Sequence, residues 1–153
     1  MKKALVAVAL ATAIPGASAQ QASVMGVWLT QSGLAHVRLA PCAQAATGAL
    51  CGTVVGLVNP KGPNGAPVAP DAATDYRNPD PAQRTRKVIG MPIMWGFKPS
   101  TDGRSFEDGK IYNGENGKVY SANVSLETDG RLRLRGFVGN PIFGETQYWT
   151  RVN

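Results

Sequence analysis

The stretch KVYSANVSLETDGRLRLRGF, residues 118–137, decides the fold. Apolar and polar side chains alternate on both sides of its Thr-Asp-Gly segment, which is the period-two pattern of half-buried β-strands. A two-residue turn would place Leu126 opposite Arg133, an apolar side chain against a charged one. A three-residue loop at 128–130 places Leu126 opposite Leu132, and a slip of one residue inverts every side chain. The sequence therefore predicts a hairpin with a three-residue loop whose glycine takes the left-handed position.

Short runs of β-branched and aromatic residues continue along the chain after residue 20, separated by Gly, Asn and Asp. Helical periodicity is almost absent. Strands of this length and spacing are typical of an antiparallel all-β domain, either an up-and-down barrel or a sandwich. Eight strands are predicted, at residues 26–31, 35–40, 50–58, 92–98, 105–112, 118–127, 131–138 and 145–152.

Residues 59–86 interrupt this pattern with six of the eleven prolines. A loop of this length is uncommon in a compact domain and is often functional or disordered. The first half, 59–65, is expected to be mobile. The second half is expected to be ordered, because Asp80 can cap a short helical turn at 82–87 with Pro81 in its first position.

The N-terminus has the three parts of a cleavable signal peptide, predicted at residues 1–19. Two lysines precede an apolar run at 4–14, and Ala-Ser-Ala at 17–19 is a small-x-small cleavage site. The run is too short to span a bilayer, which needs about 20 residues. No cysteine stands at the cleavage site for lipid attachment. We therefore expect a single domain, 20–153, in the periplasm or outside the cell, with its net charge reduced from +6 to +4 by loss of the two lysines.

The two cysteines, Cys42 and Cys51, lie between predicted strands. In an oxidising compartment an even pair is most simply a disulfide, which here would clamp the mouth of a hairpin. The alternative, a catalytic thiol, lacks support because neither cysteine belongs to a CxxC or Cys/His arrangement.

Eight short segments follow one another along the chain: GVW (26–28), HVRL (36–39), CG (51–52), DYRNPDP (75–81), GKIY (109–112), GKVY (117–120), LRG (134–136) and WTR (149–151). In this order they resemble the bacterial exported family called domain of unknown function 2147. The resemblance covers the whole mature chain and implies a secreted or periplasmic β-barrel-like domain, without assigning an activity. The proline- and glycine-rich insert at 59–70 is longer than the usual pattern.

The Gly-x-Trp opening also resembles the lipocalin signature, in which a first-strand Trp packs at the closed end of an eight-stranded barrel beneath an Arg of the last strand. Here the barrel-closing pair would be Trp28 and Arg151, with a cation–π contact of about 0.5–2 kcal/mol. Together with the eight predicted strands, this favours an antiparallel up-and-down lipocalin-like barrel with one long Pro-rich loop and a short helical turn.

The sequence contains no convincing catalytic or metal-binding constellation. His36 is the single histidine, and on its predicted strand it shares a face with Arg38, which disfavours the imidazolium. Asp75 and Asp80 could serve an envelope hydrolase, but salt bridges and helix capping explain them with fewer assumptions. Asp108 lies in a predicted turn that lacks the alternating oxygen ligands of a calcium loop. We expect no cofactor and no metal.

Aromatic residues give the remaining indication of function. Ile93, Trp95 and Phe97 alternate onto one face of their predicted strand, and Trp28, Tyr112 and Tyr120 could line the same interior. An eight-stranded barrel can be filled by side chains or can hold one small ligand. We therefore predict a non-enzymatic domain that binds a small, partly apolar ligand in the barrel, beneath the loop at 75–86. The candidate ligand-binding residues are Trp28, Trp95, Phe97, Tyr112, Tyr120, Asp75, Asn78, Arg84 and Arg86.

The alternative function is an envelope or surface interaction protein with a filled barrel, using the long loop or the arginines at 131, 133 and 135. The arginine row also has a simpler interpretation, as the solvated face of the hairpin. Basic residues are dispersed rather than gathered on one face with aromatics, so we expect no nucleic-acid partner. No second apolar segment is long enough to span a membrane.

Overall fold

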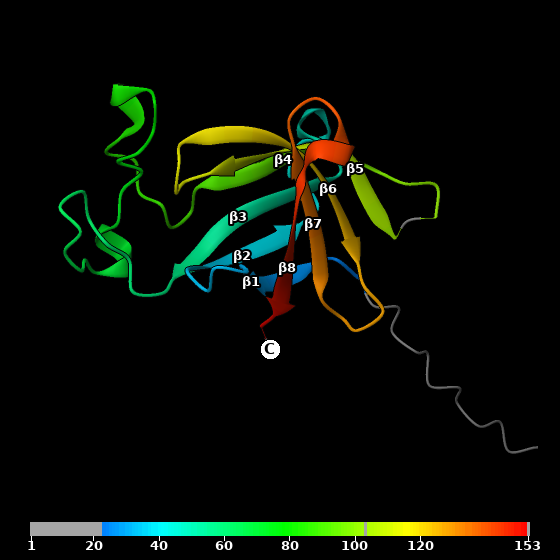
Figure 1. Ribbon diagram of the computed structural model, residues 1–153, viewed down its shortest axis with the longest axis horizontal. Helices are drawn as coiled ribbons and strands as arrows, with labels where there is room; N and C mark the ends of the chain where they lie inside the picture. Colours follow the sequence, from blue (N-terminus) through cyan, green and yellow to red (C-terminus); the bar gives the residue numbers. More distant parts are fainter. Residues whose placement is uncertain (1–22, 103, 153) are drawn as a thin grey trace, which may run out of the picture.

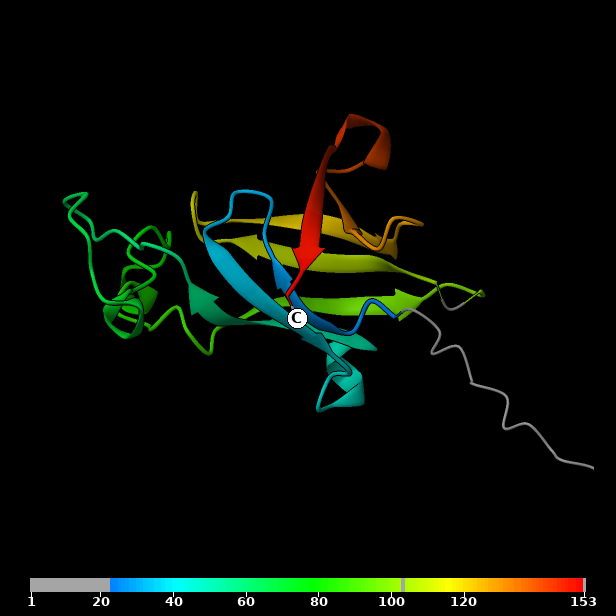
Figure 2. The ribbon, with the colours of Figure 1, turned by 90° about the horizontal axis from the view of Figure 1, so that it is seen from below.

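The computed structural model describes residues 23–102 and 104–152 as one closed antiparallel barrel, in which each strand pairs with its neighbours in the chain and β8 returns to β1. Figures 1 and 2 show the barrel with the long β3–β4 loop projecting from one end. The strands are β1 (Gly26–Leu29), β2 (Ala35–Ala40), β3 (Leu50–Leu57), β4 (Pro92–Pro99), β5 (Ser105–Asn113), β6 (Lys118–Leu126), β7 (Leu132–Phe137) and β8 (Glu145–Arg151).

The predicted strands and the register of the β6–β7 hairpin are confirmed. Leu126 pairs with Leu132 and Val124 with Leu134, as a three-residue loop requires. Gly130 has a φ of 85°, the left-handed conformation expected of it. The alternation of side chains thus decided which face of the hairpin became the barrel interior.

The barrel is closed by a short seam between its first and last strands. β1 and β8 pair at only two positions, Trp28 with Arg151 and Leu29 with Thr150. The Arg151 guanidinium lies 4.2 Å from the centroid of the fully buried Trp28 ring. It also donates to the Met25 carbonyl at 2.8 Å and to the Ser23 carbonyl. Arg151 therefore joins the segment that precedes β1 to the end of β8.

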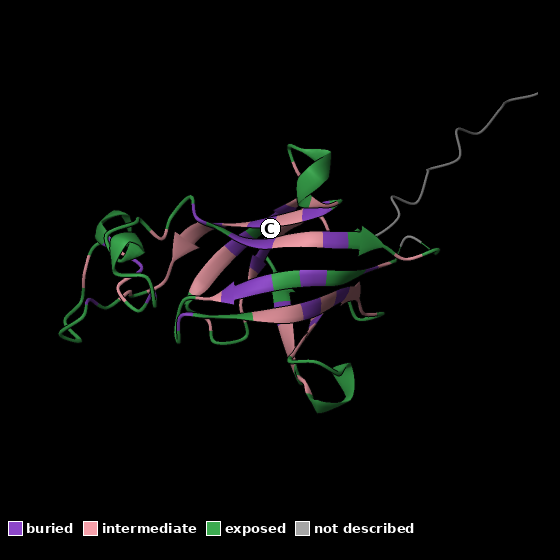
Figure 3. Ribbon diagram, turned by 90° about the horizontal axis from the view of Figure 1, so that it is seen from above, coloured by how far each residue is buried: buried purple, intermediate pink, exposed green. Residues whose placement is uncertain are grey.

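Buried apolar side chains from all eight strands pack inside the barrel, and several around Trp28 are fully buried. The buried positions lie mostly on the strands, whereas the loops are mostly exposed (Figure 3). The Trp28 indole N–H donates to the Val24 carbonyl at 2.8 Å, so this indole is satisfied although it is buried. The fully buried side chains here include Leu39, Leu50, Met94, Phe97, Val124, Leu132 and Trp149.

Strand β4 departs from the simple alternation that its sequence suggests. The β3–β4 register shifts twice between Leu50 and Thr53, and Gly96 has a φ of 79°. These irregularities turn the second half of the strand relative to the first. As a result Trp95 pairs with Lys110 and lines the outer surface of the barrel, and it does not share one interior face with Ile93 and Phe97.

The long β3–β4 loop is ordered by short local elements. Residues 61 and 67 form an isolated antiparallel bridge, as do residues 74 and 87. The expected helical turn is a single 3-10 turn, η3 (Pro81–Gln83), after η2 (Pro70–Ala72). The Asp80 carboxylate accepts from the Ala82 N–H at 3.0 Å, so the predicted cap is present although the helix is shorter than 82–87.

The disulfide links Cys42 to Cys51, with Cα atoms 4.9 Å apart. It ties the β2–β3 loop, which contains η1 (Ala45–Thr47), to the start of β3. A loop of this size is stabilised by about 2–3 kcal/mol in the chain-entropy account. The predicted signal peptide at 1–19 lies outside the described residues. Among those described, no helix is long and apolar enough to cross a membrane.

Gly26→Ala should destabilise the barrel far more than Gly33→Ala. Both glycines have positive φ angles, but a Cβ at Gly26 would lie 2.6 Å from Arg151 Nη1, whereas a Cβ at Gly33 would meet nothing within 4 Å. We expect Gly33→Ala to cost about 1 kcal/mol of backbone strain and Gly26→Ala at least about 2 kcal/mol, because it also displaces the guanidinium. Urea unfolding of both variants measures this, and equal losses would mean that Arg151 does not hold the seam.

Candidate functional site

A cavity of about 980 Å³ extends from the barrel interior to the loops at the end opposite Trp28. The loops at 30–34, 58–91, 114–117 and 138–144 surround its mouth. Its inner wall is mainly apolar, formed by Val37, Val54, Met91, Ile93, Ile111, Leu134 and Trp149. The interior is therefore only partly filled by side chains.

Gly136 gives independent evidence of this space. It pairs with the fully buried Ala122 on β6, so both positions face the interior. A Cβ built on Gly136 would meet no atom within 4 Å. A glycine in a strand interior costs packing and backbone entropy, and often marks a place that something else must approach. Here the absent side chain leaves the cavity open.

Two polar contacts interrupt the apolar wall. Gln147 accepts a hydrogen bond from the Trp149 indole N–H at 3.1 Å, and because its oxygen is used, its NH2 group is the end that can donate to a ligand. The Tyr120 hydroxyl accepts from the Asn116 amide at 2.9 Å. All four residues line the cavity, Asn116 from the turn at its mouth. An apolar wall with a few placed polar groups is the usual composition of a small-molecule site.

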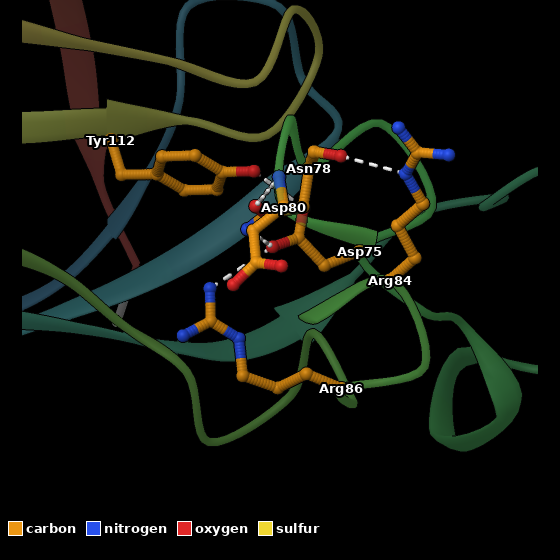
Figure 4. A network of polar contacts seen from close by, with 6 residues as sticks. All are labelled: Asp75, Asn78, Asp80, Arg84, Arg86 and Tyr112. Carbon is orange, nitrogen blue, oxygen red and sulfur yellow. Dashed lines mark hydrogen bonds and ion pairs between the residues drawn. The ribbon is translucent and has the colours of Figure 1, made fainter. Parts of the chain in front are cut away.

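Asp75 anchors the long loop to the barrel (Figure 4). Its carboxylate is almost completely buried and accepts from Tyr112 Oη at 2.7 Å, Asn78 Nδ2 at 2.7 Å and Arg86 Nη2 at 2.9 Å. Three donors, one of them cationic, offset the cost of removing the charge from water. The contact with Tyr112 is the one that crosses from the loop to strand β5.

Burial raises the pKa of Tyr112 from 10.0 to about 12, helped by the hydrogen bond to the Asp75 carboxylate and by its charge. The neutral phenol is the form that can donate to a carboxylate. Deprotonation would place two negative charges in contact in a buried site. The anchor therefore depends on Tyr112 remaining protonated.

The rest of the loop is organised around Asn78. Its side-chain oxygen accepts from the Asp80 N–H at 2.9 Å, and its backbone carbonyl accepts from Arg84 Nε at 2.8 Å. Asp80 itself caps η3. The two carboxylates considered for hydrolysis are thus both engaged in holding the loop, which is a structural use of each.

The structure distributes the predicted ligand-binding residues over several places. Tyr120 and Asp75 line the cavity, and Tyr112 lies at its edge. Trp28 and Phe97 are fully buried and belong to the packed end. Trp95, Asn78 and Arg86 line a separate groove outside the barrel, and Arg84 lines neither space. The predicted pair of Trp28 and Arg151 is in contact, at the seam.

The sequence-based prediction overlooked the wall residues Gln147 and Trp149 on β8. The alternation of side chains along β8 could have identified them. Gln147 pairs with Leu134 and Trp149 pairs with Leu132, and these two leucines face the interior. It also overlooked an apolar rim at the cavity mouth. Val138, Ile142 and Phe143 are 75%, 76% and 84% exposed there.

Arg135 holds this apolar rim in place. Its guanidinium donates to the carbonyls of Pro141 and Ile142 and to the Thr146 hydroxyl, at 2.8–3.1 Å. These contacts fix the backbone of η4 (Pro141–Phe143) against the barrel. Among the three arginines at 131, 133 and 135, Arg135 therefore stabilises a loop through hydrogen bonds and is not simply a solvated side chain.

Within the described part of the chain, no group of three or more His, Cys, Asp or Glu is arranged to hold a metal ion. His36 lies on β2 beside Gly56, whose Cβ position is occupied by the imidazole. It packs against the barrel wall at a place where β3 has no side chain.

An eight-stranded antiparallel barrel, packed at one end beneath a Trp–Arg stack and open at the other over an apolar cavity, has a lipocalin-like fold. The chain belongs to the family DUF2147, described as an uncharacterized protein conserved in bacteria, which matches residues 26–151. A protein from the human pathogen Helicobacter pylori, described as belonging to the lipocalin family, shares the fold with a TM-score of 0.68 and 23% identity, over 87% of this chain and 85% of that one. No curated protein sequence matches significantly.

Tyr112→Phe should weaken the fold at pH 8 and have little effect at pH 11.5. The raised pKa stabilises the folded state fully below pH 10, and this contribution, about 2 kcal/mol, is lost as pH rises from 10 towards 12. The phenylalanine side chain neither donates to Asp75 nor titrates. We expect the urea midpoints of the wild-type protein and Tyr112→Phe to converge at high pH. The other ionising groups are present in both proteins, so their effects cancel in this comparison. A constant difference at both pH values would contradict the role of the Tyr112 proton.

Proposed function

We propose that this protein binds a small, partly apolar ligand in the barrel cavity. The observation that carries the proposal is the open cavity itself, about 980 Å³ from the barrel interior to the mouth loops, in a barrel whose other end is packed. Ligand pockets usually measure about 300–1,000 Å³ and bury most of the ligand surface. This volume suits a molecule with an alkyl or aromatic body.

The placement of polar groups favours one orientation of the ligand. The deep wall near Val37 and Leu134 is apolar, and burying an alkyl or ring surface there contributes about 25 cal/mol per Å². Gln147 offers a donor part of the way along β8, and Tyr120 and Asn116 offer polar atoms nearer the mouth. A ligand with its apolar end inward and a hydroxyl, carbonyl or carboxyl group outward satisfies both regions.

The long loop borders the mouth of the cavity but supplies few of the proposed contacts to the ligand. Asp75 is held by three donors, so it is not free to bind a ligand cation without losing one of them. Asn78, Arg84 and Arg86 keep the loop in position beside it. We therefore place Tyr120, Gln147 and Trp149 at the centre of the binding site, with Tyr112 at its edge.

We place this function outside the cytoplasm. The disulfide between Cys42 and Cys51 and the membership of a bacterial family support this location, together with the signal-peptide pattern at 1–19. Residues 20–153 would then be the mature, single-domain protein. In the periplasm or outside the cell a binding domain can carry or sequester a ligand that water dissolves poorly.

The apolar rim favours a second candidate function, that of a surface interaction protein. Val138, Ile142 and Phe143 are exposed on a loop that Arg135 holds rigid. Exposed apolar clusters on a fixed frame often mark contact sites. This function is compatible with ligand binding, because Val138 and Phe143 also border the cavity mouth.

Gly136→Leu tests ligand binding by narrowing the cavity. The added side chain enters empty space on an interior strand position, so folding should be preserved while binding falls roughly tenfold or more. Ser125→Leu is the matched control, since Ser125 lies opposite Arg133 on the outer face of the same hairpin. The measurement is tryptophan fluorescence on titration with fatty acids and neutral amphiphiles, with mass spectrometry of any co-purified ligand.

Binding that is unaffected by Gly136→Leu would place the ligand elsewhere. The absence of both a co-purified apolar ligand and any fluorescence response would leave the cavity without this function. Loss of binding in Ser125→Leu as well would show that a change of the hairpin, rather than of the cavity, is responsible.

A further inference from the structure

A second concave site lies on the outside of the barrel wall. It is a groove of about 850 Å³ over the outer face of β2, β3 and β4. The β2–β3 loop, including Gln44 and Thr47, forms one side of it. The long loop, through Asn78, Pro79 and Arg86, forms another. Both loops therefore border the groove from opposite ends of the same part of the wall.

Each of these two sides has its own anchor. The disulfide between Cys42 and Cys51 holds the β2–β3 loop to β3. The buried Asp75, bound to Tyr112 and Arg86, holds the long loop to β5. A site whose sides are fixed before binding loses little conformational entropy when a ligand enters. The groove is thus preorganised rather than a gap between mobile loops.

The groove has a single sign of charge. Of the described residues that line it, the charged ones are Arg38 and Arg86, and none is acidic. Arg38 is exposed on β2 and forms no ion pair with the described residues. Arg86 uses one amino group for Asp75, whose carboxylate is only 1% exposed, while the Arg86 side chain remains 38% exposed. Guanidinium groups in this setting match planar or tetrahedral oxyanions.

The remaining surface of the groove is largely apolar. Trp95, which the β4 irregularity turns away from the barrel interior, lies here with Pro92, Val55 and Val119. Val119 is 51% exposed, and Trp95 is half-buried. An indole beside arginines and prolines offers a flat apolar surface next to a cationic one. This combination selects for ligands that carry both an apolar body and an anionic group.

We propose that the outer groove is a second binding site, for a small anionic amphiphile. The acidic group, a carboxylate, sulfonate or phosphate, pairs with Arg38 and the free edge of Arg86, and an aromatic or alkyl body lies against Trp95. The site is distinct from the barrel cavity, with which it shares only the edge at Tyr112. It does not depend on the function proposed for that cavity.

The test uses two fluorescent probes that differ in charge. 1-Anilinonaphthalene-8-sulfonate carries the aromatic body and an anionic sulfonate, and N-phenyl-1-naphthylamine is the same body without the sulfonate. Both are titrated into Gly136→Leu, whose added side chain occupies part of the barrel cavity, and into the variants of Arg38, which lines the groove and not the cavity. We expect the sulfonate to bind, with an affinity that falls at high salt, and the neutral probe to bind roughly tenfold more weakly.

Arg38→Gln in the Gly136→Leu background should reduce sulfonate affinity by roughly tenfold. Because Arg38 is exposed, its replacement should leave folding intact, and circular dichroism checks this directly. Arg133→Gln is the matched control, because it removes the same charge from an outer position on β7 that lines neither space. It should leave the affinity unchanged. Trp95→Leu should weaken both probes.

Three results would overturn the groove site. The first is that the sulfonate does not bind to Gly136→Leu. The second is that the neutral probe binds as tightly as the sulfonate. The third is that Arg38→Gln and Arg133→Gln reduce the sulfonate affinity equally. These outcomes are separate from failure of the cavity function, which shows as fatty-acid binding that Gly136→Leu does not change. Either site can therefore fail while the other stands.

Discussion

The barrel depends on one seam, the contact between its first and last strands. β1 is four residues long and pairs with β8 at only two positions, so backbone hydrogen bonds alone join the ends of the sheet weakly. Arg151 supplies the missing connection, because it stacks on Trp28 and binds carbonyls of the segment before β1. Gly26 leaves the space that the guanidinium occupies. A sheet closed in this way has no free edge, and it encloses an interior.

The second constraint is the buried Asp75 carboxylate. The Tyr112 hydroxyl ties the middle of the long loop to β5 through this carboxylate, while the end of the loop packs on the core through Val88 and Met91. With that contact the loop borders the cavity mouth on one side and the outer groove on the other. One ionic anchor therefore shapes both concave sites, and the disulfide completes the outer one.

Local sequence patterns were sufficient to predict most of the fold but little of the binding site. The register of β6–β7, the Asp80 cap and the cysteine pair each follow from residues close in sequence, whose geometry a turn or strand period defines. The direction of Trp95 did not follow, because two register shifts and the positive φ of Gly96 interrupt the period in β4. The Tyr112–Asp75 bond did not follow either, since 37 residues separate its ends.

The sequence by itself determined which residues form strands and which face of each regular strand is apolar, because both depend on side-chain alternation with a period of two. Its Gly-x-Trp opening and terminal Arg also determined how the barrel closes. Only the tertiary structure decided that the interior is open rather than filled. That outcome depends on the summed volumes of side chains from eight strands, and on a glycine at 136 that faces empty space.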